Sequence, residues 1–209
     1  MRTIYLIRHG EIQKPTPERC YLGQLDLPLN ETGMNQADEL SQKLLGSNPT
    51  AIYCSDLQRC VKTASIIASP HGLQPRPVKA LREIDLGRWD GLPFARVKEQ
   101  CPKEFEQRGR DIASYRPPGG ESFMDCALRV VPAFYEILHT TSGNLVLVGH
   151  AGVNRIILCH VLAAPLADLL QIGQDYACVN EITLAADGFT VRRLNGKVTE
   201  LSGRTFPVK

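Results

Sequence analysis

Short runs of β-branched and apolar residues alternate with longer segments of helical periodicity along this chain. The strand-like runs fall at residues 3–7, 51–54, 77–81 and 145–148, and the last run is entirely apolar. Apolar residues at helical spacing predict helices at residues 31–45, 55–69, 122–138 and 153–162. Strands that alternate with helices form mainly parallel sheets with both faces covered. The sequence therefore predicts an α/β fold, a mainly parallel sheet sandwiched by helices.

Local signals place the ends of several of these helices. Asn30 is the expected N-cap of the first helix, and Gly46 follows its end. Residues 55–58 (Ser-Asp-Leu-Gln) fit a capping box, so the second helix is expected to open at Ser55. Pro132 is expected to kink or split the helix that follows Ser122.

Two segments depart from this alternation. Residues 178–185 and 189–194 flank Asp187 and Gly188, which predicts an antiparallel hairpin near the carboxyl terminus. Residues 92–120 are polar, rich in Arg and Lys, and end in Pro-Pro-Gly-Gly. We expect this segment to be a small inserted cap on a single domain that spans residues 1–209.

Composition excludes several classes of function. The 24 basic and 22 acidic residues give a net charge of +2, too small to indicate a nucleic acid or an anionic membrane as partner. No apolar run has the length of a membrane span, and residues 3–7 are too short for a signal-peptide core. The 7 cysteines are scattered singly, which predicts neither a zinc site nor a disulfide framework. We therefore expect a cytoplasmic protein without a bound metal.

Charged and imidazole side chains follow four predicted strands. Arg8 and His9 follow the first, Arg59 lies one helical turn after the second, Glu83 follows the third, and His150 follows the fourth. Ligands of open α/β sheets bind at the carboxyl ends of strands, so these groups are expected to converge. Guanidinium groups bind tetrahedral dianions, imidazole supplies a nucleophile, and a carboxyl group can protonate a leaving oxygen. Together they predict a metal-free site for phosphoryl transfer.

The motifs that surround these residues resemble those of the histidine phosphatase superfamily, in the branch that contains the cofactor-dependent phosphoglycerate mutases. The resemblance covers nearly the whole chain, in the same order. It rests on residues 6–11 (Leu-Ile-Arg-His-Gly-Glu), 21–24 (Tyr-Leu-Gly-Gln), 55–59 with 63–64 (Ser-Asp-Leu-Gln-Arg and Thr-Ala), 81–83 (Leu-Arg-Glu), 119–122 (Gly-Gly-Glu-Ser) and 149–152 (Gly-His-Ala-Gly).

This resemblance implies a role for each residue of the site. His9 would attack phosphorus and become a phosphohistidine, and Glu83 would protonate the leaving alkoxide and later activate water. The phosphate-binding residues implied are Arg8, Gly23, Gln24, Arg59, His150 and Ala151, with the Gly152 N–H as a further donor. Asp85 is the alternative acid because it lies close to Glu83 in the chain. His71, His139 and His160 follow no predicted strand, so they are expected to be surface or core residues.

Two departures from the family pattern refine the expected activity. Many members carry an Asn seven residues after the first Arg, where this chain has Pro15, so that phosphate contact must be lost or replaced. The segment after Glu83 is short and lacks the Arg-rich stretch typical of mutases, which favours a phosphatase similar to the alpha-ribazole phosphatases. The expected partner is a small phosphorylated metabolite, such as alpha-ribazole phosphate or a sugar phosphate, and no cofactor is expected. A phosphoglycerate mutase and a non-catalytic regulator that binds phospho-ligands are the alternatives.

Overall fold

The structure, a computed structural model, describes residues 1–196 and contains a six-stranded sheet in the order β3-β2-β4-β1-β5-β6. The first four strands along the chain are parallel to one another, β5 is antiparallel to β1, and β6 is antiparallel to β5. The predictions of a mainly parallel sheet and of a terminal antiparallel hairpin are confirmed. Gly188 begins the last strand with φ +114°, a conformation that favours glycine. The strands are β1 Arg2–Arg8, β2 Pro49–Cys54, β3 Arg76–Pro77, β4 Asn144–Gly149, β5 Val179–Ala185 and β6 Gly188–Gly196.

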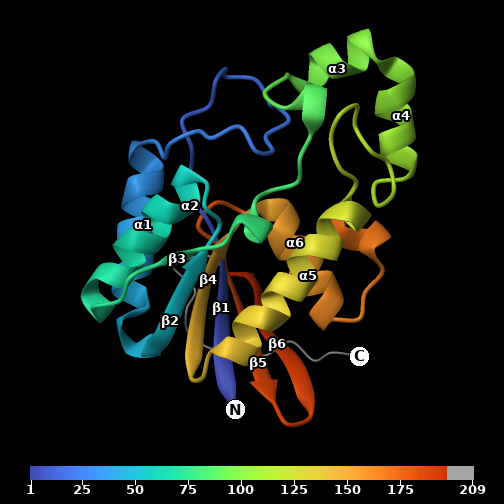
Figure 1. The fold of residues 1–209 in the computed structure, drawn as a ribbon. Coiled ribbons are helices and arrows are strands. Elements are labelled where there is room, and N and C mark those ends of the chain that lie inside the picture. The colour runs from blue at the N-terminus through green and yellow to red at the C-terminus, as the bar shows by residue number, and fades with distance from the viewer. Residues whose placement is uncertain (197–209) are drawn as a thin grey trace.

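Helices cover both faces of the sheet, as Figure 1 shows. Helices α1 (Glu31–Lys43) and α2 (Gln58–Ala68) cover one face, and α5 (Phe123–Thr140) and α6 (Ala151–Val161) cover the other. Within residues 1–196 there are five 3-10 turns, at Leu45–Ser47, Ser69–His71, Lys79–Leu81, Gly87–Trp89 and Leu166–Gln171. None of the helices within the described 196 residues is long and apolar enough to cross a membrane.

The buried strand β4 explains why both layers form. Leu145 and Leu147 belong to the core cluster under α5 and α6, whereas Val146 and Val148 belong to the cluster under α1 and α2. All four side chains are fully buried. Successive side chains of a strand point to opposite faces, so an uninterrupted apolar run requires a cover on each side.

Three local predictions need correction or refinement. Helix α2 begins at Gln58 with Leu57 as its N-cap, and Ser55 makes no capping box, because its hydroxyl accepts from the Leu57 N–H instead. The third strand is only Arg76–Pro77 and is followed by a 3-10 turn, consistent with an edge strand that ends at a residue without an N–H. Pro132 lies inside α5, which continues through it as one element.

The capping box of the described chain lies at the start of α5. The Ser122 hydroxyl accepts from the Asp125 N–H at 3.1 Å, and the Asp125 carboxylate accepts from the Ser122 N–H at 2.8 Å. This box fixes the helix just after the segment expected to be a cap, so it sets where that segment returns to the sheet.

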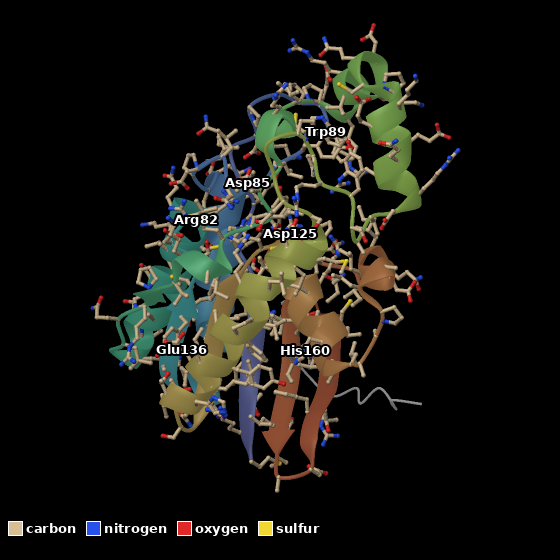
Figure 2. All side chains as sticks on the ribbon, turned by 45° about the vertical axis from the view of Figure 1, so that its right-hand side comes forward. Arg82, Asp85, Trp89, Asp125, Glu136 and His160 are labelled. Carbon is tan, nitrogen blue, oxygen red and sulfur yellow. The ribbon has the colours of Figure 1, made fainter. Side chains whose placement is uncertain are left out.

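Residues 92–120, here called the cap, contain the helices α3 (Phe94–Gln100) and α4 (Pro102–Arg110). Figure 1 places both helices beyond the carboxyl ends of the parallel strands, away from the four helices that cover the sheet. Trp89 lies at the base of the cap in Figure 2 and packs on Tyr115, with ring centroids 5.7 Å apart. The cap therefore stands over the edge of the sheet where the candidate residues converge.

Candidate active site

A cavity of about 530 Å³ opens at the carboxyl ends of β1 and β4, beneath the cap. The structure brings six of the predicted site residues to its wall, and these are Arg8, His9, Arg59, Glu83, Ala151 and Gly152. Most of residues 14–22 also line the cavity, including Pro15, which stands where many members of the family have Asn.

His9 lies directly after β1 and is held on both sides by backbone hydrogen bonds. Its N–H donates to the Gly149 carbonyl at 3.1 Å, and its carbonyl accepts from the Ala177 N–H at 3.1 Å. The ring Nδ1 lies 2.7 Å from the Gly10 carbonyl oxygen. A carbonyl can only accept, so Nδ1 carries the proton and the lone pair is on Nε2. Burial, reinforced by the Arg8 and Arg59 charges, lowers the pKa of His9 well below 6.5 and keeps the ring neutral.

Arg8 ends β1 beside His9 and is fixed by the loop that precedes β5. Its Nη1 donates to the Gln174 carbonyl at 2.6 Å, and its guanidinium carbon lies 3.8 Å from the centroid of the Tyr176 ring. Its buried Nε finds no hydrogen-bond partner in the described part of the chain. Arg8 therefore presents an unused donor near His9, of the kind that an anion could satisfy.

Arg59 and His150 hold each other in place. The Arg59 Nε donates to His150 Nδ1 at 3.3 Å, which puts the His150 proton on Nε2. The two Nη atoms of Arg59 donate to the carbonyls of Gly23 and Leu25, at 2.7 and 2.8 Å. His150 is fully buried and meets the His9 ring edge-on, with centroids 5.2 Å apart, so it lies behind the cavity wall. Burial, followed by the Arg59 charge, lowers the pKa of His150 well below 6.5.

The Glu83 carboxylate is held at the amino terminus of α6. It accepts hydrogen bonds from the backbone N–H groups of Ile84 (3.0 Å), Gly152 (2.9 Å) and Val153 (3.2 Å). The sequence predicted that the Gly152 N–H would bind substrate phosphate, but Glu83 already occupies it. A carboxylate and a helix amino terminus attract each other, which explains this arrangement. Ala151, the first residue of α6, lies at the cavity wall.

The main chain of Glu83 is held by two side chains. Its carbonyl accepts from Arg129 Nη2 at 3.0 Å and from Gln24 Nε2 at 3.1 Å. Arg129 also donates to the carbonyls of Ala80 and Arg82, both at 2.8 Å, and pairs with Glu121. The segment that carries the carboxylate is therefore braced from α5 and from the loop before α1.

Gly23 and Gln24 are not brought to the cavity wall. Besides the contacts above, the Gly23 N–H donates to Asp90 Oδ1 at 2.8 Å. Asp85, the alternative acid, accepts from the Gly87 N–H at 2.9 Å and is also outside the cavity. Figure 2 labels Asp85 between Arg82 and Trp89, on the segment that leads up to the cap.

The remaining histidines lie apart from the cavity, in agreement with their expected structural role. His160 is exposed, and its Nε2 lies 2.9 Å from the Tyr135 hydroxyl. Figure 2 places His160 on the lower half of the molecule, far from the cap. His139 is also exposed, and His71 ends a 3-10 turn.

Sequence reasoning missed three arginines that line the cavity, and these are Arg19, Arg108 and Arg155. Arg155 lies one helical turn after Ala151 on α6, and its Nε donates to the Ile172 carbonyl at 2.8 Å. The spacing of four residues could have placed it on the same side of the helix as Ala151. Arg108 comes from α4 of the cap, and no motif marks it. The wall is therefore more cationic than the predicted residues alone imply.

Across residues 1–196, no group of three or more His, Cys, Asp or Glu side chains is arranged to hold a metal ion. The side chains at this wall can stabilise the charge of a phosphoryl group with guanidinium donors. The neutral Nε2 of His9 has a free lone pair and can act as a nucleophile.

Comparisons with known proteins agree with this geometry. The family model of the histidine phosphatase superfamily (branch 1) matches residues 4–197. The glucosyl-3-phosphoglycerate phosphatase of Mycobacterium tuberculosis is 32% identical over 181 residues, which cover 82% of this chain and 80% of that protein. The crystal structure of the alpha-ribazole phosphatase from Shigella flexneri superposes with a TM-score of 0.84 at 25% identity, covering 93% of this chain and 96% of the other.

A bifunctional relative matches over one part only. The 6-phosphofructo-2-kinase/fructose-2,6-bisphosphatase of Arabidopsis thaliana is 32% identical over 196 residues, which cover 92% of this chain. The chain spans only 25% of the length of that relative. The chain is therefore similar to one part of this relative, as well as to the two phosphatases above. The predicted family is confirmed, and this chain belongs to branch 1 of the histidine phosphatase superfamily.

Proposed function

We propose that this protein is a phosphatase that hydrolyses a small phosphomonoester through a phosphohistidine at His9. One observation carries the proposal: the Nδ1 of His9 is tied to the Gly10 carbonyl, so its neutral Nε2 is available beside Arg8 and Arg59. Within residues 1–196, neither arginine forms an ion pair with a carboxylate. Two guanidinium groups without counterions, next to a neutral imidazole, suit a phosphoryl dianion.

In the first step, the Nε2 lone pair attacks phosphorus, the N–P bond forms, and the bond from phosphorus to the ester oxygen breaks. The leaving alkoxide takes a proton from Glu83, which must therefore start the step as the acid. The Gly10 carbonyl stabilises the imidazolium that develops, because it accepts a hydrogen bond from Nδ1–H.

In the second step, water attacks the same phosphorus and the N–P bond breaks. Glu83, now a carboxylate, takes the proton of the water, and inorganic phosphate leaves. His9 returns to its neutral form and Glu83 to its acid form, so atoms and protons balance over the cycle.

The groups around His9 stabilise charge on the phosphoryl oxygens. Arg8 and Arg59 are assigned this role, with the Ala151 N–H as a backbone donor at a helix amino terminus. His150 is assigned as a further donor through Nε2–H, and it also fixes the Arg59 guanidinium through Nδ1. Gly23 and Gln24 act indirectly, by holding Arg59 and Glu83.

For the substrate, the named activities of relatives suggest alpha-ribazole phosphate and phosphorylated glycerate or sugar derivatives. The test is a phosphate-release assay over these compounds, nucleotides and p-nitrophenyl phosphate. A second assay follows isomerisation of 3-phosphoglycerate in the presence of bisphosphoglycerate. We expect phosphate release from at least one metabolite and no isomerisation. Isomerisation faster than release would indicate a mutase, and absence of both would leave a binding protein.

A further inference from the structure

Arg8 and Arg59, the two guanidinium groups beside His9, are held in different ways. Arg59 donates from all three of its nitrogens, from Nε to His150 and from the two Nη atoms to backbone carbonyls. The Arg8 side chain makes one hydrogen bond within residues 1–196, from Nη1 to the Gln174 carbonyl at 2.6 Å, and its buried Nε has no partner there. Hydrogen bonds therefore fix Arg59, whereas the orientation of Arg8 depends on a further contact.

That contact is the ring of Tyr176, which lies over the Arg8 guanidinium. The guanidinium carbon is 3.8 Å from the ring centroid, and the same ring packs against His9 with centroids 5.6 Å apart. Tyr176 is half-buried and lines the cavity. The N–H groups of a guanidinium all lie in its plane, so a ring on its face fixes that plane without using a donor. Tyr176 thus orients Arg8 and leaves N–H groups free for a ligand.

The loop that carries this ring, residues 173–178, also holds the main chain of Arg8 and His9. The Cys178 carbonyl accepts from the Arg8 N–H at 3.2 Å, and the Ala177 N–H donates to the His9 carbonyl at 3.1 Å. Ala177 has φ +55°, a left-handed conformation that a residue with a side chain rarely adopts. Such a conformation persists where the surrounding contacts determine it, and it often marks a functional site.

The loop is anchored on the hairpin of β5 and β6. Gln174 is buried, and its Nε2 donates to Asn180 Oδ1 on β5 at 2.9 Å. The Asp175 N–H donates to Asn195 Oδ1 on β6 at 2.7 Å. The Tyr176 ring is therefore supported by the sheet, and its place does not depend on the cap.

We propose that Tyr176 is a positioning residue, whose ring holds the plane of the Arg8 guanidinium so that its free N–H groups meet the phosphoryl group at His9. The inference rests on the proposed phosphatase function, and Tyr176 acts through Arg8 rather than by contact with the substrate. Without the ring, one hydrogen bond would hold the guanidinium, and its donors would have to be ordered when the phosphoryl group binds. That ordering weakens both binding and the stabilisation of the transition state.

The first test follows hydrolysis of p-nitrophenyl phosphate in three variants. Tyr176→Leu removes the ring but keeps an apolar side chain, and it should lower kcat/KM by about tenfold. Tyr176→Phe keeps the ring and should stay within about twofold of the unmodified protein, because both contacts of the side chain are made by the ring. Tyr135→Leu is the same change on α5 outside the cavity and should have no effect. A folded Tyr176→Leu protein with unchanged kcat/KM, or an equal loss in Tyr176→Phe, would overturn the inference.

A double-mutant cycle with Arg8 separates positioning from a general loosening of the site. The Kd of inorganic phosphate is measured by calorimetry for the unmodified protein, Tyr176→Leu, Arg8→Gln and the double variant, and thermal unfolding checks that each is folded. Tyr176→Leu should weaken phosphate binding about tenfold in the unmodified background and less than twofold in the Arg8→Gln background. An equal effect in both backgrounds would mean that the ring does not act through Arg8. If phosphate binds too weakly to measure, the same cycle in kcat/KM decides.

The outcomes keep this inference apart from the phosphatase proposal. A protein that hydrolyses p-nitrophenyl phosphate without coupling between Tyr176 and Arg8 overturns the inference alone. A protein that binds phosphate with the expected coupling but hydrolyses no phosphomonoester overturns the phosphatase proposal and retains the role of Tyr176. A protein that neither hydrolyses a phosphomonoester nor binds phosphate overturns both.

Discussion

The carboxylate of Glu83 and the backbone of Gly152 are in direct contact, with Oε2 2.9 Å from the amide nitrogen. A Cβ atom added at Gly152 would lie 2.5 Å from Glu83 Oε1. The helix that carries Gly152 therefore positions the Glu83 carboxylate, and the glycine is required because the carboxylate occupies the space of a side chain.

Gly152→Ala is predicted to lower the rate while the protein remains folded. The added methyl group must displace the Glu83 carboxylate, and losing a positioned general acid costs on the order of 10²–10⁴ in rate. Steady-state kinetics with a sugar phosphate should reveal a loss of at least tenfold in kcat. Thermal unfolding serves as the control, since overpacking alone costs about 1–3 kcal/mol. Full activity in a folded Gly152→Ala protein would show that the carboxylate does not need this position.

Glu83→Gln should impair poor leaving groups far more than good ones. An alkoxide needs a proton as it departs, whereas p-nitrophenolate leaves without one. The measurement is the ratio of kcat for a sugar phosphate to kcat for p-nitrophenyl phosphate. Asp85→Asn is the matched control and should leave this ratio unchanged, because Asp85 lies outside the cavity. If Asp85→Asn shifts the ratio and Glu83→Gln does not, the acid has been assigned to the wrong carboxyl group.

Stability should fall as the pH drops below about 6.5, the ordinary pKa of histidine. The pKa of buried His150 is lowered well below this value in the folded protein, so between the two values the unfolded chain binds more protons. Each such histidine then lowers the free energy of unfolding by up to about 1.4 kcal/mol for each pH unit below about 6.5. Above about pH 7.5 it has no effect on that free energy. The free energy of unfolding, measured with denaturant, should decrease from pH 7.5 to pH 5.5. The decrease should be about 1 kcal/mol smaller in His150→Gln than in the unmodified protein. Identical losses in both proteins would mean that His150 is not held neutral.

Activity should survive incubation with excess EDTA. Guanidinium groups provide the positive charge at the cavity, and we assign no step to a divalent cation. The assay is p-nitrophenyl phosphate hydrolysis before and after chelation, followed by dialysis. Loss of activity that a single divalent metal restores would require a different mechanism.

Strand patterns and motifs were sufficient to predict the fold and the residues at the strand ends. The apolar run at residues 145–148 required two covering layers, and parallel strands bring Arg8, His9 and His150 to one edge of the sheet. What the sequence did not predict depends on tertiary contacts. The Glu83 carboxylate takes the Gly152 N–H because the two segments meet only in the folded chain. Arg108 reaches the cavity because of how the cap is placed, and no local pattern encodes that placement.

The capping signals illustrate the same distinction at a smaller scale. The motif at Ser55 matched a capping box but forms none, whereas Ser122 with Asp125 forms one. Strand β2 ends just before Ser55, the chain bends at Asp56 and Leu57, and Leu57 is the residue that caps α2. A short motif therefore predicts a helix start only to within a few residues.

The central claim is that His9 carries the phosphoryl group, and a quenched reaction tests it most directly. The enzyme is mixed with a labelled phosphomonoester, quenched within the first turnovers in alkali, and digested for peptide mapping. Acid-labile, alkali-stable phosphate is expected on the peptide that contains His9. It should be absent in His9→Ala, and His150→Ala should still form it, about 10²–10³ times more slowly. Label on the His150 peptide, or turnover without any labelled histidine, would contradict the account.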